Sequence, residues 1–238
     1  MNQSRLLEVL PEAERARLQP FLEEIDLEDG ATLIEAGAPI DSVWFPHDCV
    51  TSTVVETRDG ATIEVGLMGT EGLVGLSLLL GRTLSNTTVL VQIPGKATRM
   101  KASDFVTQVV ERKGPLYYAL LRYTDAFLAM VSQTAACNSL HAVDARLSRW
   151  ILMTHDRVQR DELPLTHEFL GYMLGVRRAS VSVAANALQN LGLISYNRGM
   201  IRVLNRAGIE KQSCECYFIV RRITDDLYDP DIFNEAVS

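Results

Sequence analysis

The chain has 238 residues, a formal net charge of −7 and 47% apolar residues. A chain of this length and apolar content buries a sizeable core in one or two domains, which excludes a disordered protein. The negative charge excludes a protein that coats nucleic acid indiscriminately, because such proteins depend on a broad cationic surface. It still allows a dimer with a local basic patch, and arginine outnumbers acidic residues between 160 and 206.

The N-terminus, MNQSRLLEVLPEAERARLQ, is charged and amphipathic and does not have the continuous apolar core of a signal peptide. No later stretch is long and apolar enough to span a membrane. The cysteines are too few and too unevenly spaced for the disulfide framework of a secreted protein; they are Cys49, Cys137, Cys214 and Cys216. These features predict a cytoplasmic protein with no membrane partner.

The first half of the chain changes from helical to strand-like patterning. Short amphipathic helices are expected in residues 3–24. From Ile25 onward, runs of Val, Ile and Thr alternate with Gly and Pro turns. The clearest predicted strands are 43–45, 50–56, 62–68, 87–93 and 97–100. Strands this closely spaced, without intervening helices, indicate an antiparallel sandwich or barrel rather than a parallel sheet.

A long helix is predicted from Pro115, because proline favours the first helical turn and the following apolar residues alternate at steps of four and three. This heptad pattern, about 35 Å long, predicts a dimer seam. The seam consists of Leu116, Leu120, Tyr123, Phe127, Met130, Thr134 and Cys137, and the first six are the predicted dimer contacts. A second stripe is expected to pack on the β-domain, formed by Tyr117, Leu121, Leu128 and Val131. The alternative is a long helix buried within one chain, since a core helix is also apolar on two sides.

The stretch 163–195 has the pattern of two short helices joined by a glycine. Thr166 is a good N-cap for the first helix, and Gly175 lets the chain turn sharply after it. The second helix has an apolar stripe at steps of three and four. The polar residues off that stripe are Arg177, Arg178, Ser180, Ser182 and Asn186. This pattern indicates a helix-turn-helix, and the alternative is a plain helical hairpin with solvated arginines.

Residue types at the start of the second helix suit DNA recognition. A recognition helix enters the major groove with its N-terminal end, which therefore needs a forked donor for guanine and small hydroxyl residues. Beyond the helix, LISYNRGMIRV alternates around a turn at 197–199 and predicts a hairpin wing that touches phosphates. The predicted DNA-binding residues are Thr166, Arg177, Arg178, Ser180, Ser182 and Arg198.

The order of β-domain, long helix and C-terminal winged helix resembles the Crp/Fnr superfamily of bacterial transcription regulators. The clearest matching segments are 30–37 (GATLIEAG) with 43–45 (VWF), the helix-turn-helix with Gly175 and Arg178, and 145–150 (ARLSRW). The resemblance implies an α+β fold. An N-terminal antiparallel β-roll (a double-stranded β-helix) would occupy residues 1–112, a long dimerisation helix 113–140, and a winged helix-turn-helix with a tail 141–238.

The resemblance also locates an effector pocket. Superfamily members that bind cyclic AMP hold its ribose with a Gly-Glu pair and its phosphate with a later Arg-Ser/Thr-Ala run. The matching positions here are Gly75-Leu76 and Asn86-Thr87-Thr88, so both charged contacts are missing. A buried phosphate without its arginine costs several kcal/mol, and Arg82 could substitute only if its loop is rearranged. The resemblance implies a pocket that does not use cyclic AMP, formed by Gly75, Leu76, Arg82, Asn86, Thr87 and Thr88.

In this resemblance, Arg178 falls on the superfamily's guanine-reading arginine. The next reading positions, commonly Glu and Arg, are Ala179 and Val183 here, so the operator should differ and could present a thymine methyl to them. The implied partners are a second copy of the chain and double-stranded DNA with a palindromic operator. RNA polymerase is a further partner if the protein is an activator.

No cofactor and no metal are expected. Oxygen-sensing members hold an iron–sulfur cluster with N-terminal cysteines, and no cysteine precedes Cys49. Cys214-Glu215-Cys216 could bind a metal, but a C-x-C pair needs two further ligands that the neighbouring sequence does not offer. Ordinary helix cysteines are the simpler interpretation. His47 beside Cys49 could bind haem or a metal, but a turn between two strands explains these residues more simply.

Two other function classes remain. Double-stranded β-helices also house metal-dependent enzymes, but these need clustered histidines with a carboxylate. The four histidines are scattered, and no nucleophile elbow, P-loop or dinucleotide fingerprint is present, so no catalytic residue is assigned. The other class is a sensor module that responds to a cyclic nucleotide or another ligand and whose winged helix binds a protein partner instead of DNA. Loss of salt-dependent DNA binding would distinguish that module.

Overall fold

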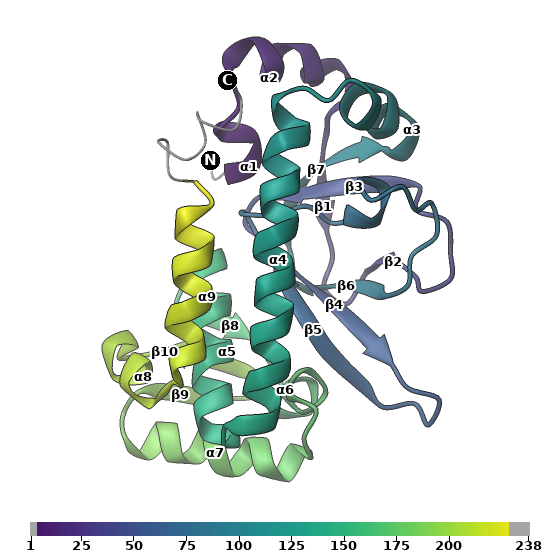
Figure 1. Cartoon of the computed structure of the whole chain (residues 1–238). Coiled ribbons are helices and arrows are strands. Elements are labelled where there is room, and N and C mark those ends of the chain that lie inside the picture. The colour runs from purple at the N-terminus through teal and green to yellow at the C-terminus, as the bar shows by residue number, and fades with distance from the viewer. Residues whose placement is uncertain (1–3, 229–238) are drawn as a thin grey trace. The chain divides into compact units, whose positions relative to one another are not determined.

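The computed structural model describes residues 4–228. Two compact units make up this part of the chain (Figure 1). Among the described residues, the β-rich unit contains 4–53, 67–129 and 223–228. The helical unit contains residues 54–66 and 130–222. Within residues 4–228, no helix has the length and apolar content needed to cross a bilayer.

The β-rich unit begins with α1 (Arg5–Glu8), α2 (Glu12–Leu18) and a 3-10 turn, η1 (Gln19–Phe21). Seven strands follow in the chain: β1 (Glu23–Leu27), β2 (Thr32–Ile34), β3 (Ser42–Pro46), β4 (Val50–Glu56), β5 (Thr62–Met68), β6 (Thr88–Ile93) and β7 (Gly95–Lys101). The end of β4 and most of β5, within residues 54–66, group with the helical unit. One sheet has the order β1-β7-β3 and the other β2-β6-β4-β5, with antiparallel pairs β1–β7, β3–β7 and β2–β6. The five predicted strands and the α+β class are therefore confirmed.

A short helical turn, η2 (Leu76–Leu78), lies between β5 and β6. After β7, α3 (Ala102–Phe105) and η3 (Val106–Glu111) lead to the long helix α4 (Pro115–Leu140). The expected dimer seam on α4 is wrong for Leu116, Leu120 and Tyr123. These side chains are at most 3% exposed and belong to the core of the β-rich unit. Phe127 packs against the same core. They cannot meet a second chain, because the fold of one chain already covers them.

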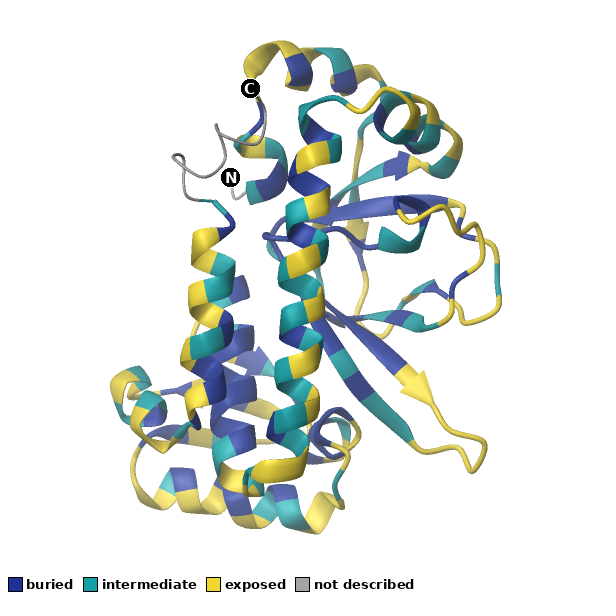
Figure 2. Cartoon of the chain, viewed as in Figure 1, coloured by how far each residue is buried: buried dark blue, intermediate teal, exposed yellow. Residues whose placement is uncertain are grey.

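Helix α4 has exposed as well as buried residues along its length (Figure 2). Tyr118 is 41% exposed, Leu121 40% and Leu128 60%. Leu121 and Leu128 were expected to pack on the β-domain, and their exposure contradicts this expectation, although one side of Leu128 lines a cavity of the β-rich unit. Tyr117 of the same stripe does pack against the core of that unit, as expected. Heptad spacing marks both stripes as apolar but does not say which one faces the sheet. The last two expected seam residues, Met130 and Thr134, belong to the helical unit, where Met130 is buried.

The helical unit contains the end of α4 and then α5 (Val143–Val158), β8 (Glu162–Pro164), α6 (His167–Leu174) and α7 (Arg178–Asn190). It continues with β9 (Ile194–Asn197), β10 (Met200–Val203), α8 (Arg206–Gln212) and α9 (Glu215–Asp226), whose last turn groups with the other unit. The predicted helix pair and hairpin are α6–α7 and β9–β10. Strand β8, which is only three residues long, completes an antiparallel sheet of order β8-β10-β9.

Helix α5 is the core element of the helical unit. Nine consecutive residues, 146–154, are buried, and α5 packs against α6, α7 and α8. Two of the nine are arginines. Arg146 donates to the carbonyl oxygen of Leu174, the last residue of α6, and Arg149 donates to Thr134 Oγ1 over 2.8 Å. The segment 145–150 is thus where α5 is tied to its neighbours.

Gly175 ends α6 in the left-handed conformation, with φ of +61°. A Cβ there would lie 2.7 Å from Ile63 Cδ1. We expect Gly175→Ala to lower the free energy of unfolding by about 1–2 kcal/mol from the backbone alone. Urea denaturation followed by circular dichroism measures this change. Gly192→Ala is the comparison variant: Gly192 has φ of +68° but nothing within 4 Å of its Cβ, so this variant should lose stability through the backbone alone. Any larger loss in Gly175→Ala is then due to the contact with Ile63. Wild-type stability in Gly175→Ala would contradict the expectation.

Candidate nucleic-acid interface

Helix α6 begins at a well-formed cap. The hydroxyl of Thr166 accepts a hydrogen bond from the Phe169 N–H over 3.1 Å, which satisfies one of the unpaired donors of the first turn. This bond uses an acceptor lone pair of the exposed hydroxyl, whose hydrogen can still be donated to a phosphate oxygen. Thr166 therefore supports the fold and offers a donor at the surface.

The N-terminal end of α7 presents arginines to solvent. Arg177 is the N-cap and Arg178 the first helical residue, and both are exposed. On the same outer surface Ala179 is exposed and Val183 is 72% exposed. The opposite stripe of α7 is buried against the unit, and it consists of Val181, Ala184, Ala185 and Leu188. A helix N-terminus attracts anions, and two arginines strengthen that attraction.

Ser182 lies closer to the protein interior than expected. Its hydroxyl donates to the carbonyl oxygen of Arg178 over 3.1 Å and lies 3.0 Å from His167 Nδ1. The buried His167 ring stacks on Tyr196, with centroids 3.9 Å apart. Burial lowers the pKa of His167, and the positive charge of Arg178 lowers it further. A neutral histidine and a tyrosine of β9 therefore buttress the first turn of α7, a role that no sequence pattern indicated.

The turn between β9 and β10 carries Arg198 in a conformation that suits glycine or asparagine. Arg198 has φ of +47° and the next residue, Gly199, has φ of +81°. Positive φ at both central positions is typical of a type I′ hairpin turn, where Asn-Gly is the preferred pair. An exposed arginine in this position costs conformational energy, and such a residue is a candidate for a functional role.

The helical unit also contains an arginine that is not available to DNA. Arg206 Nη2 lies 2.5 Å from both Asp156 Oδ1 and Tyr217 Oη, and Arg206 Nε donates to Glu210 over 3.2 Å. These contacts tie α8 to α5 and α9. The arginines of the basic stretch 160–206 therefore have different roles. Arg206 holds helices together, whereas Arg177, Arg178 and Arg198 are exposed.

A cavity of about 180 Å³ in the β-rich unit contains three of the residues expected at an effector pocket. Gly75, Leu76 and Thr87 line it, together with side chains of α4 that include Phe127. None of its lining residues is charged. The other three expected residues do not line it: Arg82 donates to Asn86 Oδ1 over 3.2 Å at the surface, and Thr88 accepts from the Ala36 N–H.

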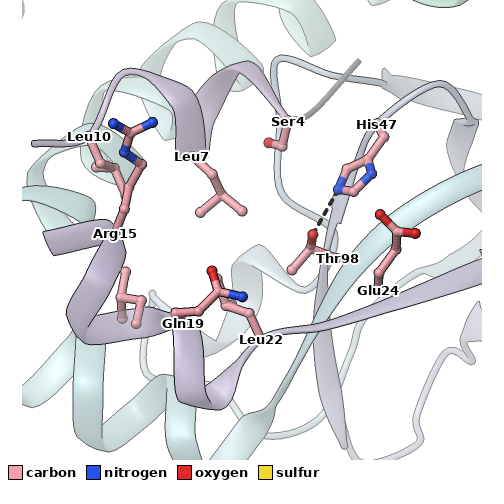
Figure 3. Close-up of a pocket in the computed structure, with 10 residues that line it drawn as sticks. Ser4, Leu7, Leu10, Arg15, Gln19, Leu22, Glu24, His47 and Thr98 are labelled. Carbon is pink, nitrogen blue, oxygen red and sulfur yellow. Dashed lines mark hydrogen bonds between the residues drawn. The ribbon is translucent and has the colours of Figure 1, made fainter. Parts of the chain in front are cut away.

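The segment around His47 forms the turn between β3 and β4, as predicted. His47 Nε2 lies 2.7 Å from Thr98 Oγ1 in the wall of a second cavity, of about 170 Å³ (Figure 3). Burial lowers the pKa of His47. Burial also raises the pKa of Cys49 to about 12, and its thiol donates to the Lys96 carbonyl oxygen. Cys49 is thus a protonated core thiol and not a thiolate ligand.

Comparisons with known proteins agree with this geometry. The family model of the Crp-like helix-turn-helix domain matches residues 145–212, which run from the start of α5 to the end of α8. A search of curated protein sequences finds no match.

Several solved structures have the same fold at low sequence identity. FixK2 from Bradyrhizobium japonicum is 15% identical, with a TM-score of 0.65 over 81% of this chain and 98% of its own. A putative regulator of the Crp/Fnr family from Eubacterium rectale is 16% identical, with a TM-score of 0.63 over 87% and 97%. The c-di-GMP responsive global regulator CLP from Xanthomonas campestris is 14% identical, with a TM-score of 0.61 over 81% and 99%.

These matches confirm the resemblance drawn from the sequence, and they place the exposed end of α7 in a domain of known type. Residues 145–212 match the Crp-like helix-turn-helix domain, and the chain shares the fold of solved regulators of the Crp/Fnr family.

Proposed function

We propose that the protein is a cytoplasmic, homodimeric transcription regulator that reads one operator half-site with each α7 helix. The observation that carries this proposal is the N-terminal end of α7, where Arg177 and Arg178 are exposed on a helix whose opposite stripe is buried. A helix presented in this way fits the major groove with its first turn toward the base edges. Two such helices in a symmetric dimer would read half-sites about one DNA turn apart.

Base contacts and phosphate contacts come from different residues. Arg178 can fork onto the O6 and N7 atoms of a guanine, and the exposed methyl groups of Val183 can meet a thymine methyl. Arg177 and Ser180 lie at the same end of the helix, and both are suited to phosphate oxygens. Thr166, beside Gly199 of the wing turn, is suited to them as well. Arg198 of the wing is placed to contact phosphates beside the groove. The hydroxyl of Ser182 is engaged within the protein, so we assign Ser182 a supporting role.

Dimerisation is assigned to the exposed stripe of α4. Leu121 and Leu128 are seven residues apart, so they occupy equivalent positions on successive heptads. Both are large apolar residues with at least 40% of their surface exposed. A second copy of α4 would cover them, and the two-fold axis between the helices would explain a palindromic operator. This stripe replaces the seam expected from the sequence.

The β-rich unit is assigned the sensor role, with an effector other than cyclic AMP. The cavity beside Gly75 and Thr87 has no charged wall residue, so nothing in the wall neutralises a cyclic phosphate. A regulator of the same fold, CLP, responds to a different nucleotide, c-di-GMP. A small neutral or apolar effector suits this cavity, and RNA polymerase is a further partner if the regulator activates transcription.

Selection of bound fragments from a random duplex pool tests the proposal. We expect the purified protein to enrich a palindromic sequence with two half-sites about one helical turn apart, and to bind it with a steep salt dependence. Adding cyclic AMP should change neither the sequence nor the affinity. Enrichment only with cyclic AMP would contradict the assigned effector class. Absence of enrichment at every salt concentration would favour a protein partner for the winged helix.

Arg178→Ala should weaken binding to the selected operator by about 1–3 kcal/mol for each half-site and relax the choice of one base pair. The reason is loss of the forked donor to guanine. Because the side chain is exposed, we expect its removal to leave the fold unchanged. Fluorescence anisotropy with operators varied at each position measures both effects. Arg177→Ala is the control, which should weaken all sequences alike. Equal affinity of wild type and Arg178→Ala would contradict the assignment.

Arg198→Asn separates the charge of the wing from its fold. Asparagine accepts positive φ more readily than arginine, so we expect the free energy of unfolding to stay the same or to rise. The slope of log affinity against log salt should fall by about 1 for each subunit, equally for operator and unrelated DNA. Titrations at several salt concentrations provide this slope. An unchanged slope would show that Arg198 does not contact phosphate.

A further inference from the structure

Four potential metal ligands meet in the helical unit, and none of them is among the predicted DNA-binding residues. They are Cys137, His141, Cys214 and Cys216, and one ligand atom from each lies within 4.8 Å of all the others. The Cys137 and Cys214 sulfurs are 3.5 Å apart, as are the Cys216 sulfur and His141 Nδ1. The interpretation of Cys214 and Cys216 as ordinary helix cysteines overlooked two further ligands, which the fold brings from α4.

Local structure explains how two short motifs become one cluster. Cys137 and His141 are four residues apart at the end of α4, and the His141 N–H donates to the Cys137 carbonyl oxygen over 3.1 Å. That bond continues the helical turn past Leu140, so both side chains lie on one face. Cys214 lies in the link between α8 and α9, and Cys216 is in the first turn of α9. A C-x3-H motif on one helix thus faces a C-x-C motif at the start of another.

We propose that these four residues bind one zinc ion in a tetrahedral Cys3His site. Zinc–sulfur bonds of about 2.3 Å place the sulfurs of a tetrahedral site about 3.8 Å apart, close to the spacing found here. Thiolate and imidazole in a tetrahedral arrangement are the donor set typical of zinc. The four ligand atoms lie within 4.8 Å of one another, which is too close to surround an iron–sulfur cluster. This spacing suits a single metal ion.

The surroundings of the cluster match the outer shell of a zinc site. His141 directs Nδ1 toward the cysteines and Nε2 toward Glu215, whose carboxylate oxygen is 3.3 Å away. A ligating histidine usually donates its other ring N–H to a carboxylate in this way, which fixes the tautomer and the ring orientation. Gln133 Nε2 donates to the Cys216 sulfur over 3.0 Å. Both contacts orient ligand atoms toward the centre of the group.

Burial and charge indicate a structural site rather than a catalytic one. The three cysteines are at most 6% exposed, and four protein ligands leave no coordination position open for water or substrate. Three thiolates and one zinc ion carry a net charge of −1. The positive charges of the buried Arg146 and Arg149 act on Cys137 and offset this negative charge.

The ion would join the end of α4 to the start of α9. Both segments belong to the helical unit. Each motif supplies only two ligands, so neither can hold a zinc ion alone. Zinc would therefore stabilise the unit that carries α7. This inference rests on the cluster itself and does not depend on the proposed DNA recognition.

Metal analysis of the full-length protein, purified without chelators, tests the site. We expect about one zinc per chain in the wild type and almost none in Cys214→Ser/Cys216→Ser. Cobalt-substituted wild type should show the intense visible bands of tetrahedral coordination and a thiolate-to-cobalt charge-transfer band. Cys49→Ser is the matched control, because Cys49 is a buried cysteine of the other unit and should leave the zinc content unchanged.

Glu215→Gln provides a variant with little risk of misfolding, because the side chain is 71% exposed. Its zinc affinity, measured by competition with a chromophoric chelator, should fall about 10–100-fold while the circular dichroism spectrum is retained. Glu111→Gln, an exposed carboxylate of the β-rich unit, should leave the affinity unchanged.

Three results would overturn the proposal. They are equal zinc content in wild type and Cys214→Ser/Cys216→Ser, a cobalt spectrum without a thiolate charge-transfer band, and a Cys137–Cys214 disulfide in protein isolated without oxygen.

Discussion

The burial of α5 is the constraint on which the helical unit depends. A helix with nine consecutive buried residues has no solvent-facing side along that segment, so other elements must cover it all round. Helices α6, α7 and α8 pack against it, and Thr134 of α4 and Glu64 of β5 accept hydrogen bonds from its buried Arg149 and Trp150. The two arginines in this segment cannot be left without partners, because an unpaired buried charge is costly. Their bonds to the end of α6 and to Thr134 therefore specify where the neighbouring elements lie.

The exposure of Arg177 and Arg178 at the N-terminal end of α7 follows from the same packing. The stripe of α7 that contains Val181 and Leu188 is buried, which turns the arginines at the N-terminal end outward. His167 and Tyr196 then hold the first turn of α7 from the inside. The zinc site that we propose lies where α4 ends and α9 begins. Packing, stacking and metal coordination would each stabilise the one unit that presents α7.

Local patterns predicted most of the fold, because strand spacing and helical periodicity are properties of short segments. The five strands, the long helix, and the helix-turn-helix with its hairpin were all evident. Two features were missed for physical reasons. The stripes of α4 are both apolar, and only the shape of the sheet decides that Leu120 is covered while Leu128 is exposed. The cluster joins Cys137 to Cys214 across 77 residues, a separation at which no local motif is visible.

Guanine methylation interference on the selected operator tests most directly whether the exposed end of α7 reads DNA in a symmetric dimer. Methylation at N7 removes the acceptor that a forked arginine uses in the major groove. The account predicts strong interference at one guanine in each half-site, with the two guanines related by the two-fold axis of the operator. Interference at no guanine, or at guanines without that symmetry, would contradict it.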